Sequence, residues 1–275
     1  MKVARHLPGF SVALGVTMTA VTLVVLLPLA ALLVATAPAG PKAFFQVLGS
    51  PRVLAALRLS LGAAFVAAGL SSCAGLLIAW VLVRLPFPGR TLVDSLIDLP
   101  FALPTAVAGI TLTTLYAPGG WFGRPLAALG IKAAYTPLGI VLALVFLGLP
   151  FAVRTLQPVL ASLDREAEDA ATSLGARPLQ VFLRLLVPEL LPAWLTGFSL
   201  AFARGLGEYG SVVFISGNLP LKTEVTPLLI MTKLEQYDTA GAAVLAVILL
   251  AASFLLLLTA NRLEAWSAAP LRRAR

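Results

Sequence analysis

The sequence predicts an all-α integral membrane protein with six transmembrane helices in a single domain, residues 1–275. Of the 275 residues, 59% are hydrophobic and only 12% are charged, whereas soluble domains carry about a quarter charged residues. Long apolar runs without Asp, Glu, Lys or Arg recur along the chain. These runs lack strand-like alternation, which argues against a β-barrel. An ordinary soluble enzyme and a disordered chain are therefore excluded, and with Cys73 as the single cysteine, so is a disulfide scaffold.

Five runs without charge are each long enough to cross a membrane as a helix. Crossing about 30 Å of hydrocarbon takes roughly 20 residues, and in lipid the backbone must be hydrogen-bonded internally, which favours helices. The first run is longer than the apolar core of a secretory signal, so we expect an uncleaved anchor. The runs are residues 10–40, 59–83, 99–123, 133–153 and 239–261.

A sixth apolar run, residues 190–217, contains two charges, Arg204 and Glu208. In the third run, Pro100 and Pro104 predict a kink because proline cannot donate a backbone hydrogen bond. The predicted spans, in chain order, are residues 10–36, 55–83, 95–117, 136–156, 189–216 and 240–261, with a loop at 157–188 between the fourth and fifth.

The distribution of Lys and Arg predicts that both chain ends are cytoplasmic. In this orientation the inner segments carry twelve Lys and Arg residues and the outer segments six, while Arg58 and Arg204 lie within spans. Positive residues concentrate on the cytoplasmic side of membrane proteins. The net charge of +8 therefore indicates the orientation of the chain in the membrane. We expect the helices to contact membrane lipid, and we expect no nucleic-acid partner.

The chain offers no candidate catalytic residue, metal site or cofactor site. It has no glycine-rich phosphate loop ending in Gly-Lys-Ser or Gly-Lys-Thr. His6 is the only histidine, which excludes a catalytic triad and a histidine-based zinc site. Glu208 is the only acid deep within a span, so no carboxylate pair is available there. The remaining classes are transport, channel formation and assembly with partners.

The loop at 157–188 is expected to form two short helices that meet at Gly175. Residues 164–174 combine charged residues with Ala and Leu, which favour a helix, and glycine suits a helix C-terminus. After Arg177, apolar residues return with the spacing of one helical face. A merely solvated helical hairpin has the same composition, so the pattern leaves that interpretation open.

The spacing in this loop resembles the EAA loop of type I ABC importer permeases. That pattern is Glu-Ala-Ala, three residues, Gly, nine residues and Ile-x-Leu-Pro; here Asp169 replaces the Glu, and the run 185–188 reads Leu-Leu-Val-Pro. The resemblance implies a type I ABC importer permease architecture whose loop docks on a cytoplasmic ATPase. Whether Glu168 or Asp169 touches the ATPase stays open. The implied coupling residues are Asp164, Arg165, Glu168, Asp169, Ala170, Ala171 and Gly175.

Charged residues inside the spans are the second group of candidates. Ionisable residues in a membrane are costly and usually face the protein interior or water. Arg204 and Glu208 are four residues apart and can pair on one helical face. They form either a structural ion pair or, with Tyr209, a gate or pathway lining. Arg58, near the outer end of the second span, either lines an anion path or extends its charge to the interface.

The outer segment between the fifth and sixth spans is expected to contain a short helix. Thr226 is the expected N-cap, with Pro227 at the first helical position. This helix would lie at the outer mouth of the protein.

Residues 207–218, together with 223–224, 227–230 and 233–238, resemble sulfate/thiosulfate permeases of the T-subunit type. This resemblance implies uptake of sulfate or thiosulfate. It also implies a second, related permease subunit in a heterodimer, two cytoplasmic ABC ATPase subunits and a periplasmic sulfate-binding protein. One alternative is a homodimeric molybdate or tungstate permease, which shares the Gly-Glu-aromatic-Gly stretch. Another is a secondary transporter or channel that works without an ATPase and has no need of the EAA loop.

Overall fold

The computed structural model describes residues 9–273, and within this range the chain is helical and contains no β-strand. Its first half comprises α1 (Phe10–Val21), η1 (Thr22–Leu26), α2 (Leu27–Thr36), η2 (Ala37–Ala39), α3 (Gly40–Gly49), α4 (Pro51–Arg84), α5 (Arg90–Ile97), α6 (Leu99–Ala102), α7 (Thr105–Tyr116) and α8 (Gly123–Ala128). Its second half comprises α9 (Pro137–Ser162), α10 (Arg165–Ser173), α11 (Pro178–Val181), η3 (Phe182–Leu186), α12 (Val187–Leu206), α13 (Val212–Ile215), α14 (Thr226–Glu235) and α15 (Thr239–Arg273).

Among the described residues, five helical segments are long and apolar enough to cross a membrane. They are Phe10–Thr36, Pro51–Arg84, Pro137–Ser162, Pro178–Leu206 and Thr239–Ala260. The all-α membrane class is confirmed, while the count of six spans and the orientation stay predictions. Lys2, Arg5 and Arg275, which were counted for the orientation, and His6 lie outside the described residues.

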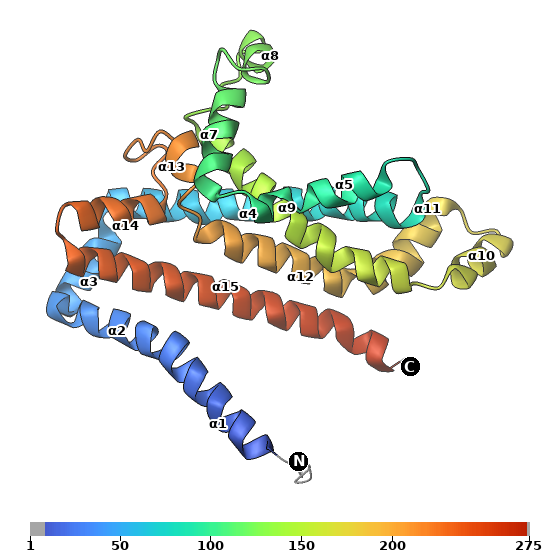
Figure 1. The fold of residues 1–275 in the computed structure, drawn as a ribbon, viewed down its shortest axis with the longest axis horizontal. Coiled ribbons are helices and arrows are strands. Elements are labelled where there is room, and N and C mark those ends of the chain that lie inside the picture. Colours follow the sequence, from blue (N-terminus) through green and yellow to red (C-terminus); the bar gives the residue numbers. More distant parts are fainter. Residues whose placement is uncertain (1–8, 274–275) are drawn as a thin grey trace.

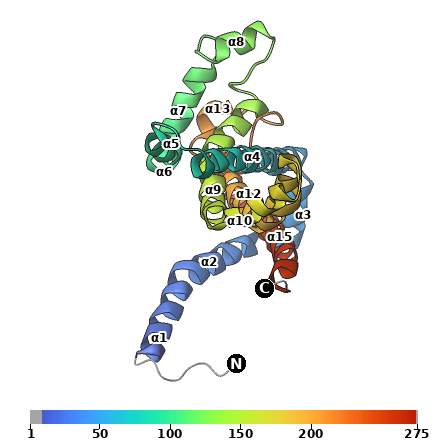
Figure 2. The same ribbon diagram turned by 90° about the vertical axis from the view of Figure 1, so that its right-hand side faces the viewer.

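Helices α4, α9 and α12 form the core of the molecule, and α15 packs along α12 and α14 (Figure 1 and, seen from the end, Figure 2). Small residues allow the three core helices to approach one another closely, as is common between membrane helices. A Cβ atom added to Gly75 of α4 would lie 2.6 Å from the Cβ of Ala152 on α9. One added to Gly197 of α12 would lie 2.5 Å from Thr155 Oγ1 on α9.

Replacing Gly75 with leucine is therefore expected to push α4 away from α9 and destabilise the fold. Overpacking a tight core costs about 1–3 kcal/mol, which thermal unfolding of the purified protein in detergent would detect. Gly62→Leu is the matched control, because Gly62 lies on the same helix and has nothing within 4 Å of its added Cβ. Equal losses of stability in both variants would contradict the proposed helix contact.

Residues 95–117 do not form the single kinked helix that the sequence suggests. The chain breaks at Asp98 and again at Leu103, which is extended, so that α5, α6 and α7 are separate helices. Pro104 accounts for the break at Leu103, because a proline disfavours a helical conformation in the residue before it. Pro100 accounts for the break at Asp98, because it has no N–H to donate to the Leu96 carbonyl. Helix α5 lies beside the core, whereas α7 points away from it and carries α8 at its tip (Figures 1 and 2).

Arg154 of α9 holds α5 against the core. Its guanidinium donates to the carboxylates of Asp94 and Asp98, to the Asp94 carbonyl and to the side chain of Gln157, at distances of 2.6–2.9 Å. The hydrogen bond from Gln157, together with Arg154, keeps the pKa of Asp94 below its usual value. Asp94 thus stays ionised and binds the arginine at neutral pH.

Candidate functional site

The apolar run 189–216 is also interrupted, and the interruption forms the candidate site. Helix α12 ends at Leu206, residues 207–211 are not helical, and the short helix α13 begins at Val212. Two glycines, at 207 and 210, lie in the break. Non-helical backbone at membrane depth is found where it is buried in protein or lines a cavity. The fifth predicted span is therefore not one continuous helix, because a break and a short helix form its C-terminal third.

The predicted pair of Arg204 and Glu208 bridges this break. Arg204 Nη1 lies 2.5 Å from Glu208 Oε2. The Glu208 side chain is only 3% exposed, whereas that of Arg204 is 36% exposed. The acid is thus inside the protein, while the base reaches its surface.

Ser211 supplies the other bonds to the Glu208 carboxylate. Its backbone N–H and its hydroxyl donate to Glu208 Oε1 at 2.9 and 3.0 Å. A buried charge is tolerated only when it is paired and its remaining lone pairs accept hydrogen bonds. With these three donors Glu208 meets that condition, and it fixes residues 207–211 in one conformation.

Helix α7 packs directly on this segment. A Cβ on Gly109 of α7 would lie 2.5 Å from the Ser211 carbonyl oxygen, and one on Gly210 would lie 2.1 Å from Thr105 Oγ1. A larger residue at Gly109 would need a backbone shift, and one at Gly210 would need the Thr105 side chain to move. The segment that carries Glu208 is therefore held between the core and the helix that projects from it.

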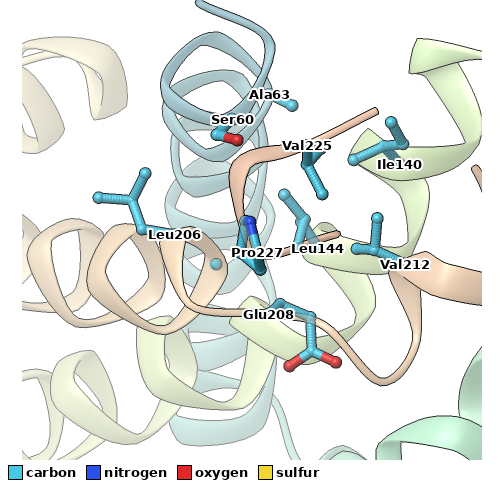
Figure 3. Close-up of a pocket in the computed structure, with 10 residues that line it drawn as sticks. Ser60, Ala63, Ile140, Leu144, Leu206, Glu208, Val212, Val225 and Pro227 are labelled. Atoms are coloured by element: carbon cyan, nitrogen blue, oxygen red, sulfur yellow. The ribbon is translucent and has the colours of Figure 1, made fainter. Parts of the chain in front are cut away.

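A small cavity lies beside Glu208 (Figure 3). Side chains from α4 (Ser60, Ala63), from α9 (Ile140, Leu144) and from the start of α14 surround it, and its volume is about 10 Å³. That is room for about one water molecule. In this conformation this cavity has no room for a larger solute.

Polar contacts tie α4 to the segment before α14. The Ser60 hydroxyl accepts a hydrogen bond from the Thr226 backbone N–H at 2.7 Å and lies 3.0 Å from the Thr226 hydroxyl. Arg52 binds both carboxylate oxygens of the buried Glu224 at 2.7 Å. The expected cap at Thr226 is wrong: Val225 is the N-cap, and Ser60 from another helix satisfies the freed N–H.

Arg58 and Tyr209 are not brought into this cluster. Arg58 is exposed on α4 and takes part in none of the ion pairs among the described residues. Ser60, two positions further, faces the core instead, since residues two apart do not share a helical face. The Tyr209 side chain is 38% exposed. Arg52 and Glu224, which do pair, were missed because 172 residues separate them.

The loop before α12 forms two helices joined at Gly175. Asp164 caps α10, accepting a hydrogen bond from the Glu166 N–H at 2.9 Å. Gly175 has a φ of +87°, and the next residue, Ala176, donates its N–H to the Ala171 carbonyl at 3.0 Å. This is the left-handed glycine stop of a Schellman motif, which other residues adopt only with strain.

The two faces of α10 differ in what they contact. Glu168 binds Arg84 of α4 with Oε1 at 2.5 Å from Nη2, and Ala171 packs on the apolar cluster between α4, α9 and α12. Asp169 and Arg165 are exposed, and Leu174 at the C-cap is 89% exposed. The outer face of α10 therefore presents charged and apolar groups that have no partner within the described residues.

The apolar helical core, with a charged break in one helix and a protruding short helix, places the chain among membrane proteins. The chain belongs to the family of inner membrane components of binding-protein-dependent transport systems, whose sequence profile matches residues 71–268. It is thus a multi-pass protein of the inner membrane with the ABC importer permease fold.

Individual relatives are similar over nearly the whole chain. The sulfate transport system permease protein CysT of Salmonella typhimurium is 49% identical over 94% of both chains. The CysT protein of Escherichia coli is 48% identical at the same coverage, and the probable one of Nephroselmis olivacea is 50% identical over 87% of this chain and 84% of that one.

Solved structures share the fold at low identity. A bacterial ABC transporter involved in the import of the acidic polysaccharide alginate matches with a TM-score of 0.75 at 14% identity, covering 93% of this chain and 94% of that chain. The same kind of transporter, in complex with its alginate pentasaccharide-bound periplasmic protein, matches with a TM-score of 0.76 at 16% identity over 92% and 93%.

Proposed function

We propose that this chain is the permease subunit of an ATP-driven importer for sulfate, with thiosulfate as a second substrate. The identity of about 49% to a sulfate permease over 94% of the chain supports the substrate. The observation that carries the transport role is the set of bonds from Arg204 and Ser211 to the buried Glu208 carboxylate in the break after α12.

This cluster is proposed to act as a gate. A dianion loses hydration on entering a low-dielectric region and needs compensating positive charge. In the closed conformation Glu208 neutralises Arg204. When α12 and α13 move apart, the guanidinium is released and can make charge-assisted hydrogen bonds to an oxyanion. Arg58, exposed on α4, is proposed as a further positive charge along the path, and the exposed Tyr209 as part of its lining.

The energy is proposed to enter through α10. The chain lacks a phosphate loop, so ATP hydrolysis belongs to two cytoplasmic ABC ATPase subunits. The outer face of α10, with Asp169, Arg165 and Leu174, is the docking surface for one of them. Asp169 is then the acid that meets the ATPase, because Glu168 is occupied by Arg84.

The remaining partners follow from the same proposal. A second, related permease subunit completes the pathway as a heterodimer, and a periplasmic sulfate-binding protein delivers the anion. The family description, which is of binding-protein-dependent transport, supports such a delivery protein. A homodimeric molybdate or tungstate permease is not favoured, since the similar relatives carry sulfate names.

Competition against labelled sulfate uptake in membrane vesicles tests the substrate. Unlabelled thiosulfate is expected to suppress sulfate uptake, whereas molybdate at the same concentration leaves it unchanged. Vesicles that lack this chain and are treated identically provide the background. Strong suppression by molybdate, together with uptake of molybdate itself, would contradict the sulfate assignment.

A further inference from the structure

Helix α10 has few attachments to the rest of the molecule. Its strongest side-chain link is the ion pair between Glu168 and Arg84. Ala171 adds only a small apolar contact. A force applied to the exposed face of α10 can therefore reach the core through this ion pair and through the chain at its two ends, Leu163–Asp164 and Gly175.

Arg84 is buried, and its contacts hold its side chain in one position. It is the last residue of α4, and its side chain is only 9% exposed. Its guanidinium carbon lies 5.6 Å from the centre of the Trp80 ring, which in turn meets Phe182 edge-on at 5.8 Å. An arginine held by a carboxylate and an aromatic face has little freedom to swing, so a displacement of Glu168 moves α4 with it.

Helix α4 leads from Arg84 to the candidate gate. Its 34 residues form a continuous rod of about 50 Å at 1.5 Å per residue. Midway, Ala64 lies 3.5 Å from the position of a Cβ on Gly205, next to Arg204. One turn earlier, Ser60 lines the cavity beside Glu208 and holds Thr226. The same helix thus touches α10 at one end and both sides of the gate along its length.

We propose that the Arg84–Glu168 ion pair is the link that passes a displacement of α10 to α4, and through α4 to the segment around Glu208. The inference rests on the proposed docking of an ATPase on α10. Arg84 and Glu168 are positioning residues that touch neither ATP nor the transported anion. Removing either charged side chain uncouples the ATPase from the gate, while the ATPase stays bound to the permease.

The test uses the intact complex with its ATPase. This chain carries a spin label on Cys73, which is its single cysteine and is exposed on α4. Trapping the complex with ATP and vanadate is expected to change the label's spectrum. In Arg84→Met, which keeps the apolar stem against Trp80, this change is lost while the ATPase still copurifies. Sulfate uptake per ATP falls about tenfold, within the range of typical coupling energies. The charge-swapped variant Arg84→Glu/Glu168→Arg restores both signals.

Arg262→Met, at an exposed arginine of α15, is the control and should behave as the wild type. An unchanged label response in Arg84→Met, or loss of the ATPase from that complex, would overturn the proposal. So would a wild-type label that does not respond to ATP. If the label in the wild-type complex responds but the complex takes up no sulfate, the substrate assignment is contradicted. The proposed role of the Arg84–Glu168 pair would then still be supported.

Discussion

Replacing Arg204 with methionine is expected to abolish sulfate uptake and to destabilise the protein. The Glu208 carboxylate would remain buried without its cation, and this loss costs up to about 3–5 kcal/mol, the value for a fully buried ion pair. Thermal unfolding of the purified complex measures the stability, and labelled sulfate uptake in vesicles measures the transport.

The double variant Arg204→Met/Glu208→Gln separates the two interpretations of this pair. Glutamine keeps the shape of the side chain and can still accept the hydrogen bonds from Ser211, so stability should return to within about 1 kcal/mol of the wild type. Uptake should stay at background, because the positive charge is missing. A double variant that transports sulfate normally would show that the pair is only structural.

Replacing Asp169 with lysine is expected to disconnect the ATPase while leaving the fold intact. Asp169 is exposed, and surface substitutions usually change stability by no more than about 0.5 kcal/mol. Removing one partner of an interfacial charge pair costs about 2–5 kcal/mol of binding, so copurification of the ATPase and ATP-driven uptake should both fall roughly 30-fold or more.

Ala167→Lys is the matched control for this experiment. Ala167 is also exposed on α10, but it lies two residues away and hence about 200° around the helix. This variant should retain the ATPase and transport sulfate. If Ala167→Lys is as damaging as Asp169→Lys, or if Asp169→Lys has no effect, the assigned docking face is wrong.

Local features of this protein could be predicted from its sequence because they depend on neighbouring residues. The glycine stop at Gly175 follows from a single residue and its flanks. The spacing of Arg204 and Glu208 was enough to predict their pairing. The helix end at Leu206 was missed because an apolar run was extended through two glycines that mark the break.

Features that depend on distant segments could not be predicted. Pro100 and Pro104 indicate a break, but the direction of α7 depends on the close fit of Gly109 against Ser211. The pairs Arg52–Glu224 and Arg84–Glu168 join residues 172 and 84 positions apart. Nothing in the local sequence around Glu168 shows that it faces Arg84 while Asp169 faces outward, and this difference selects the acid proposed to meet the ATPase.

Reconstitution into liposomes tests the central claim, that this chain is a passive pathway driven by an ATPase docked on α10. This chain and the second permease subunit are reconstituted with or without the ATPase. The liposomes receive binding protein and ATP, and uptake of labelled sulfate is measured. We expect uptake only when ATPase and ATP are both present, and none when residues 164–175 are scrambled. Vigorous uptake by the permease alone, with that segment scrambled, would contradict the account.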